Sequence, residues 1–203
     1  MIKIIDYGLG NILAFQNVFK RLGVQIGIAR TAADLAGATK LVLPGVGAFD
    51  QAMRLLDGSG MREGLDDCVI ARRVPVLGVC VGMQILADSS EEGEAAGLGW
   101  IGGRVKGFGS LRRDDLLIPH MGWNDVTPAT QNGLLGQLGP GARFYFLHSF
   151  YFECAESRHV AAVTHYGLDF ASAVHRENIY GVQFHPEKSH QFGAGLLKSF
   201  AAL

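Results

Sequence analysis

The sequence has little cysteine, and its three cysteines lie far apart. Cys68, Cys80 and Cys154 are an odd number and form no CxxC pair. This distribution argues against a disulfide framework or a zinc cluster and is typical of a reducing compartment. We therefore expect a cytoplasmic protein with no metal site.

An excess of charge of one sign is also missing. The net charge is −1 over 203 residues, so nothing provides the basic surface that nucleic acid requires or the polybasic surface that anionic lipid attracts. The most apolar stretch, residues 74–87, is shorter than the ~20 residues of a membrane-spanning helix. The first residues turn polar too soon for a signal peptide. We expect one soluble domain over residues 1–203, without nucleic acid or membrane partners.

Strand and helix patterns alternate over residues 1–90, which predicts a parallel sheet flanked by helices. Ligands bind such sheets beyond the carboxyl ends of the strands. The strands are expected at 2–5, 24–29, 40–43 and 75–79, and the helices at 12–22, 50–57 and 61–72.

The second half of the chain has short strand patterns separated by turns. They indicate an antiparallel extension, so the expected fold is a three-layer, open, mostly parallel α/β sheet. Residues 128–141 are interpreted as a surface loop with a short helix, and 191–202 as a closing helix. The strand patterns lie at 100–108, 116–118, 123–127, 143–147, 159–166 and 170–184, with Asn178 in a turn.

Cys80 stands at the end of an apolar strand pattern, between Gly78 and Gly82. A strained strand-to-helix turn of this kind presents a nucleophile to a substrate. Unpaired N–H groups at the start of the following helix favour the thiolate, which is the reactive form. A buried structural cysteine is the alternative from this stretch alone.

Gly8 and Gly10 follow the first strand and invite a dinucleotide-binding interpretation. The third glycine of that motif is missing, and no acidic residue ends the next strand. A tight turn with Asn11 as helix cap explains the pattern better.

His185 and Glu187 flank Pro186. Proline favours an extended conformation for the residue before it, and side chains two apart in an extended segment point the same way. The carboxylate would then orient the imidazole as a base for Cys80. A solvated pair at a strand end is the alternative.

Two backbone segments are candidates for an oxyanion hole, which stabilises a negatively charged intermediate. One donor would be the N–H of Val81, just after the nucleophile, and the other would come from the glycine turn at Val46 and Gly47. The acidic loop at 91–94 is either solvated or receives a substrate ammonium group.

Three motifs in order, Pro-Gly-Val-Gly at 44–47, Gly-Val-Cys-Val-Gly-Met-Gln at 78–84 and Phe-His-Pro-Glu-Lys-Ser at 184–189, resemble the triad (class I) glutamine amidotransferases. Three further segments and a longer form of the first motif narrow the resemblance to the glutaminase subunits of imidazole glycerol phosphate synthase. These are Ile-Asp-Tyr-Gly-Leu-Gly-Asn at 5–11, Pro-Gly-Val-Gly-Ala-Phe at 44–49, Met-Gly-Trp-Asn at 121–124 and His-Ser-Phe at 148–150. Together they extend over essentially the whole chain.

The resemblance implies glutamine hydrolysis through a thioester on Cys80, with His185 and Glu187 completing the triad and no cofactor. The ammonia would pass to a separate cyclase, a (β/α)₈ barrel that makes imidazole glycerol phosphate in histidine biosynthesis. The substrate-contact positions of the family fall on Gln84, Glu92, Ser149 and Phe150. Its partner-facing positions fall on Asn11, Met121, Trp123, Asn124 and Lys188.

Two positions depart from the family pattern: Phe150 stands where tyrosine is common, and Val81 where leucine is common. Three other interpretations remain open at this point. The chain could serve anthranilate or para-aminobenzoate synthesis, could be a cysteine peptidase or γ-glutamyl hydrolase, or could be a regulatory module that has lost catalysis.

Overall fold

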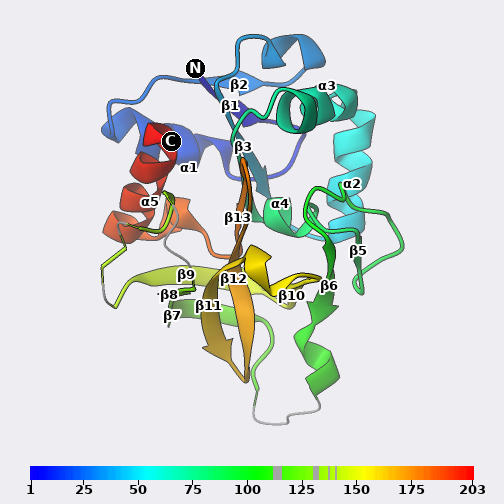
Figure 1. Cartoon of the computed structure of the whole chain (residues 1–203), viewed down its shortest axis with the longest axis vertical. Helices are drawn as coiled ribbons and strands as arrows, with labels where there is room; N and C mark the ends of the chain where they lie inside the picture. The colour runs from blue at the N-terminus through cyan, green and yellow to red at the C-terminus, as the bar shows by residue number, and fades with distance from the viewer. Residues whose placement is uncertain (112–115, 130–132, 137, 140) are drawn as a thin grey trace.

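A large mixed β-sheet runs through the molecule (Figure 1). The computed structural model describes residues 1–111, 116–129, 133–136, 138–139 and 141–203. The main strand order is β2-β1-β3-β4-β13-β12-β10-β6-β5, and β11 pairs with both β12 and β8. This confirms a mostly parallel sheet at one end with an antiparallel extension at the other.

The parallel part consists of β1 (Ile2–Ile5), β2 (Ile26–Ala29), β3 (Lys40–Gly45), β4 (Val76–Cys80) and β13 (Ile179–Val182). Strands β3 and β4 are buried along almost their whole length because helices cover both faces of the sheet. Gly45 at the end of β3 pairs with Cys80 at the end of β4. The Val46–Gly47 turn after β3 and the turn at Cys80 after β4 therefore leave the sheet side by side.

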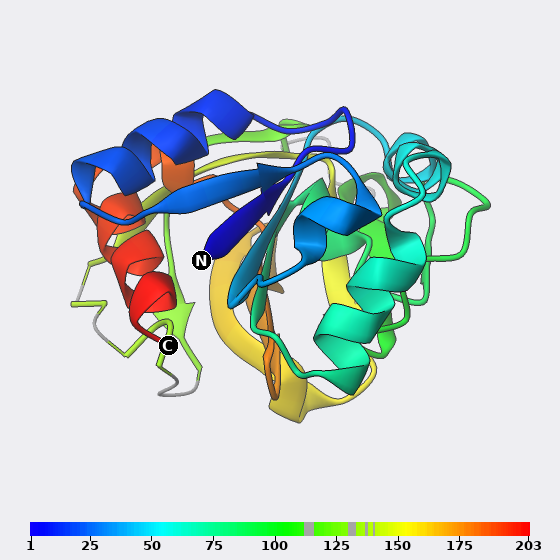
Figure 2. The same cartoon turned by 90° about the horizontal axis from the view of Figure 1, so that it is seen from above.

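Helices α1 (Ile12–Arg21) and α5 (His190–Ala202) lie on one side of the parallel strands, and α2 (Phe49–Gly58) and α3 (Arg62–Asp66) lie on the other (Figure 2). Phe15, Val18 and Phe19 of α1 are buried, as their helical spacing predicts. Asn11 caps α1, because its side chain accepts a hydrogen bond from the N–H of Ala14.

The turn before α1 packs closely against the end of β3. Gly10 has φ +101°, and a Cβ there would lie 2.7 Å from Cβ of Pro44. Glycine is therefore required for this turn to pack on the end of β3. The tight-turn interpretation is confirmed.

The extension is built from β5 (Ser89–Ser90), β6 (Gly103–Gly107), β8 (Thr127–Pro128), β10 (Phe150–Cys154), β11 (Val160–Tyr166) and β12 (Leu168–Arg176). Strands β7 (His120–Asp125) and β9 (Arg143–His148) pair with each other in a separate two-stranded sheet. Asn178 lies in the turn before β13, as expected, and donates hydrogen bonds to the carbonyls of Val69 and Val74.

Three local expectations need correction. Residues 116–118 form no strand, and the following strand begins only at His120. The helix after Cys80 is a single turn, α4 (Val81–Gln84), so its dipole is weaker than that of a long helix. The segment 61–72 divides into α3 and a π-helical turn, η2 (Asp67–Ala71).

Residues 133–136 of the expected loop at 128–141 are turns, and residues 130–132, 137 and 140 lie outside the described residues. In the described part of the chain, no helix is long and apolar enough to cross a membrane.

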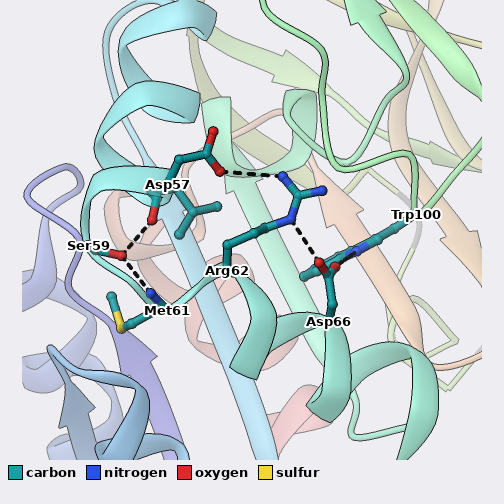
Figure 3. A network of polar contacts seen from close by, with 7 residues as sticks. Asp57, Ser59, Met61, Arg62, Asp66 and Trp100 are labelled. Carbon is teal, nitrogen blue, oxygen red and sulfur yellow. Dashed lines mark hydrogen bonds and ion pairs between the residues drawn. The ribbon is translucent and has the colours of Figure 1, made fainter.

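A polar network fixes the α2–α3 connection beside the sheet (Figure 3). Arg62 lies 2.9 Å from Asp66 and 3.5 Å from Asp57. The indole N–H of Trp100 donates to Asp66 at 2.7 Å. This network ties the helices outside the sheet to the segment that leads into β6.

Candidate active site

Cys80 occupies a strained backbone conformation at the end of β4. Its φ and ψ are 56° and −116°, which is unusual for a residue with a side chain. A Cβ on Gly82 would lie 1.9 Å from the carbonyl oxygen of Leu43, and one on Gly78 would lie 2.5 Å from the carbonyl oxygen of Gly82. The two glycines therefore permit the sharp turn that presents Cys80.

The loop after β3 packs directly on this turn. A Cβ on Gly45 would lie 2.5 Å from the backbone nitrogen of Gly82. Val46 and Gly47 follow at once and line the same pocket as Cys80 and Val81. The geometry therefore brings together the two segments expected to form an oxyanion hole.

His185 and Glu187 form a buried pair next to Cys80. Nδ1 of His185 lies 2.9 Å from a carboxylate oxygen of Glu187, and their side chains are only 4% and 2% exposed. Cys80 and His185 line the same pocket, and the interaction with Cys80 raises the pKa of the imidazole. Because Nδ1 faces Glu187, Nε2 is the nitrogen left for the thiol.

The expected pairing is confirmed, but its local geometry differs in part. His185 is extended, as the following proline predicts, whereas Glu187 lies in a 3₁₀ turn, η5 (Pro186–Lys188). Strand β9 holds this turn in place: the N–H of His185 donates to the carbonyl of Tyr145, and Ser189 accepts from the N–H of Tyr145.

The charge state of His185 reflects two opposing effects. Burial alone lowers the pKa of the imidazole, but hydrogen bonds to Cys80 and Glu187, together with their negative charge, raise it to about 9. The imidazolium form is therefore stabilised between these two groups. Such a perturbed histidine beside a cysteine is a signature of a catalytic site.

A pocket of about 290 Å³ opens above Cys80. Among the expected residues it is lined by Val46, Gly47, Cys80, Val81, Gln84, Glu92, Ser149, Phe150, His185 and Lys188. Pro119, Leu147 and His148 complete the lining. The expected substrate positions, which are far apart in the sequence, therefore line one small pocket.

Gln84 and Glu92 line the pocket, and hydrogen bonds to neighbouring residues fix both side chains. The Gln84 amide donates to the carbonyl of Phe150 at 3.1 Å and to Oε1 of Gln183 at 3.0 Å. A carboxylate oxygen of Glu92 accepts from the N–H of Phe49 at 2.8 Å. Phe150 takes part through its backbone, so the missing tyrosine hydroxyl does not disturb this contact.

The expected partner-facing residues separate into two groups. Met121 and Trp123 are 62% and 40% exposed on β7, and the ammonium group of Lys188 lies 5.8 Å from the centre of the Tyr145 ring. Asn11 and Asn124 instead use their side chains internally: Asn11 caps α1, and Asn124 hydrogen-bonds His120 and the carbonyl of His165.

Sequence reasoning missed Gln183 and His148. Gln183 is fully buried, with its amide nitrogen 3.9 Å from the Cys80 sulfur. The available signal was its position two residues before His185, within the apolar strand pattern expected at 170–184. For His148 the available signal was its place in the His-Ser-Phe segment at 148–150, directly before the expected contacts Ser149 and Phe150.

A family model for class I glutamine amidotransferases matches residues 3–202. The HisH subunit of imidazole glycerol phosphate synthase from Bdellovibrio bacteriovorus is 58% identical over the full length of both chains. The corresponding protein from Leptospira borgpetersenii is 54% identical, again over both full lengths. A crystal structure of a glutamine amidotransferase has a TM-score of 0.75 and 20% identity, covering 100% of this chain and 99% of that one.

The fold and these matches define the protein class: the chain belongs to the class I glutamine amidotransferases. Within that class it falls in the family of HisH subunits of imidazole glycerol phosphate synthase. It is therefore a glutamine amidotransferase of histidine biosynthesis, and the interpretations as a peptidase or a non-catalytic module are set aside.

Proposed function

We propose that Cys80, His185 and Glu187 are the residues that hydrolyse glutamine. The observation that carries this assignment is the buried His185–Glu187 pair, whose histidine lines the same pocket as Cys80. In the first step the Cys80 sulfur attacks the side-chain amide carbon of glutamine, and His185 transfers the thiol proton to the leaving ammonia. Water then attacks the thioester with His185 as base, releasing glutamate and restoring the thiol.

The oxyanion of both tetrahedral intermediates would lie just beyond the carboxyl ends of β3 and β4. The N–H of Val81 and one from the Val46–Gly47 turn are the proposed donors. Their support is the pairing of Gly45 with Cys80 and the shared pocket. The loss of one such donor typically lowers the rate about 10²–10³-fold.

The amino-acid end of glutamine would lie against Gln84, Glu92 and the Ser149–Phe150 backbone. Glu92 supplies a carboxylate for the substrate ammonium group, and backbone groups of β10 supply hydrogen bonds. All of these residues line the pocket. A substrate with both an ammonium group and a side-chain amide therefore fits the arrangement.

An active-site label tests the cysteine assignment directly. An electrophilic glutamine analogue, such as a chloroketone, should add one equivalent to the chain, and peptide mass spectrometry should find it on Cys80. Cys154→Ser should be labelled like the wild type, whereas Cys80→Ser should not be. Labelling that persists in Cys80→Ser would contradict the assignment.

We also propose that the cyclase, a (β/α)₈ barrel, binds the face formed by Met121, Trp123, Tyr145, Leu147 and Lys188. In the register of β7 and β9, Trp123 pairs with Tyr145 and Met121 with Leu147. Leu147 and Lys188 also line the glutamine pocket. A partner on this face would therefore receive ammonia close to where it forms.

Three further proposals concern the domain organisation, the location and the cofactor requirement of the protein. Residues 1–203 are proposed to act as a single glutamine amidotransferase domain, supported by the continuous sheet. A cytoplasmic location is supported by the free thiols of Cys68, Cys80 and Cys154. No cofactor takes part in the proposed reaction.

A further inference from the structure

A chain of buried and partly buried hydrogen bonds connects β7 with the glutamine pocket. The amide nitrogen of Asn124 lies 3.1 Å from Nε2 of His120, and Nδ1 of His120 lies 2.9 Å from Nε2 of His148. Nδ1 of His148 lies 2.8 Å from the carbonyl oxygen of Phe150. The proposed reaction uses neither histidine.

At the pocket end, the acceptor determines which atom of each hydrogen bond in this series is the donor. The carbonyl oxygen of Phe150 can only accept, so Nδ1 of His148 must carry the proton. Nε2 of a neutral His148 is then an acceptor. The proton between the two rings must therefore belong to Nδ1 of His120.

The Asn124 end leads independently to the same assignment of donors and acceptors. The amide nitrogen of Asn124 also lies 3.0 Å from the carbonyl oxygen of His165, which can only accept. That contact places the NH₂ group, and not the amide oxygen, toward His120. Nε2 of His120 must then accept, so its proton again lies on Nδ1.

The surroundings favour two neutral rings. His120 is stacked between Phe146 and Tyr166, at ring-centre distances of 4.7 and 3.9 Å. Burial lowers the pKa of His120 to about 4, and burial, together with the nearby His185, lowers the pKa of His148 to about 3. A second proton on either ring would set two donors against each other.

The chain ends on groups that shape the pocket. The Phe150 carbonyl accepts from both His148 and Gln84. Gln84 also donates to Gln183, whose amide nitrogen lies near the Cys80 sulfur. The position of one carbonyl therefore affects the wall on which glutamine rests.

We propose that His120 and His148 are positioning residues of the glutaminase site. As neutral rings protonated on Nδ1, they form a one-way hydrogen-bond chain from Asn124 that holds the Phe150 carbonyl and Gln84 in place for glutamine. This inference rests on the proposed function of the pocket. It adds a role for two histidines that touch none of the reacting atoms.

The tautomers can be measured without turnover. In ¹⁵N-histidine-labelled full chain, long-range ¹⁵N–¹H spectra should show the Nδ1–H form for both residues, opposite to the Nε2–H form that a solvent-exposed neutral histidine side chain prefers. Neither should titrate between pH 5 and 8. The Nε2–H form, or titration near the ordinary histidine pKa, at either residue would overturn the proposal even if glutamine hydrolysis is confirmed.

Kinetics in the complex with the cyclase test the consequence. His120→Phe keeps a ring in the stack but removes the donor to His148, so it should raise KM for glutamine about tenfold with a smaller effect on kcat. His120→Asn places an N–H near the position of Nδ1 and should restore much of the loss. His159→Phe, a buried histidine outside the pocket lining, is the matched control.

An unchanged KM in a folded His120→Phe variant would contradict a positioning role. If that variant does not fold, His120→Asn and the tautomer spectra still test the positioning role. A wild-type complex without glutaminase activity would instead refute the proposed function, and the spectra would remain a separate test of the chain.

Discussion

Nδ1 of His185 faces a carboxylate oxygen of Glu187 at 2.9 Å, inside a turn where almost no solvent reaches either side chain. The carboxylate fixes the tautomer that leaves Nε2 for Cys80. In the proposed reaction it would also stabilise the positive charge that the ring acquires when it takes the thiol proton.

Glu187→Gln should therefore damage catalysis far more than binding. The amide keeps the shape but removes the charge, and we expect kcat to fall by about 10²–10⁴-fold with little change in KM. The pKa of His185 should also drop from about 9. A pH–rate profile and NMR titration would measure both. A rate within threefold of the wild type would contradict the orienting role.

The same pair predicts a pH-dependent contribution to stability. The pKa of His185 is raised from 6.5 to about 9 in the folded state, so the folded state binds this proton more tightly than the unfolded state. The stabilisation is fully present below pH 6.5 and is lost as the pH rises through 9.

Urea unfolding at pH 6, 7.5 and 9 would test this. The difference in unfolding free energy between wild type and His185→Gln should shrink as the pH rises. Glu187→Gln serves as the control, because its own pH dependence over this range should be weaker than that of the wild type. A difference that grows with pH would contradict the linkage.

Gly82→Ala should be strongly destabilising because its Cβ would meet a backbone carbonyl at 1.9 Å. We expect a loss of about 2–4 kcal/mol in the free energy of unfolding, together with loss of glutaminase activity. Gly195→Ala on α5 is the matched control. It has open space around its Cβ position and should be neutral or gain up to about 1 kcal/mol. Equal effects of both changes would refute the packing argument.

Trp123→Ala should weaken binding of the cyclase by about 30-fold or more, as expected for an exposed aromatic anchor in an interface. Isothermal titration calorimetry would measure the affinity. Ile70→Ala removes an exposed apolar side chain on η2, outside the proposed face, and should leave it unchanged. Equal affinities for the wild type and Trp123→Ala would place the interface elsewhere.

The parallel half of the fold could be predicted because its signals are local. Alternating strand and helix patterns located β1, β3, β4 and the main helices, and the glycines around Cys80 identified the sharp turn before any contact was known. The strand predicted at residues 116–118 was wrong, because a short apolar run is compatible with a strand but does not require one.

Much of the site's support was not accessible in this way. His120 and His148 lie together because β7 pairs with β9. Gln84 and Gln183 are hydrogen-bonded although they are far apart in the sequence. Motif spacing identifies groups close together in the chain, such as His185 and Glu187. It does not specify which buried polar groups will satisfy one another across the sheet.

Glutamate release from glutamine is the most direct test of the central claim. It would be measured for this chain alone, and then with a cognate cyclase and its ribonucleotide substrate, with Cys80→Ala beside each. We predict strong release in the complete mixture, weak release from the chain alone, and none above background in the variant. Equal release with and without the cyclase would contradict the partner assignment, and release that survives in Cys80→Ala would contradict the catalytic one.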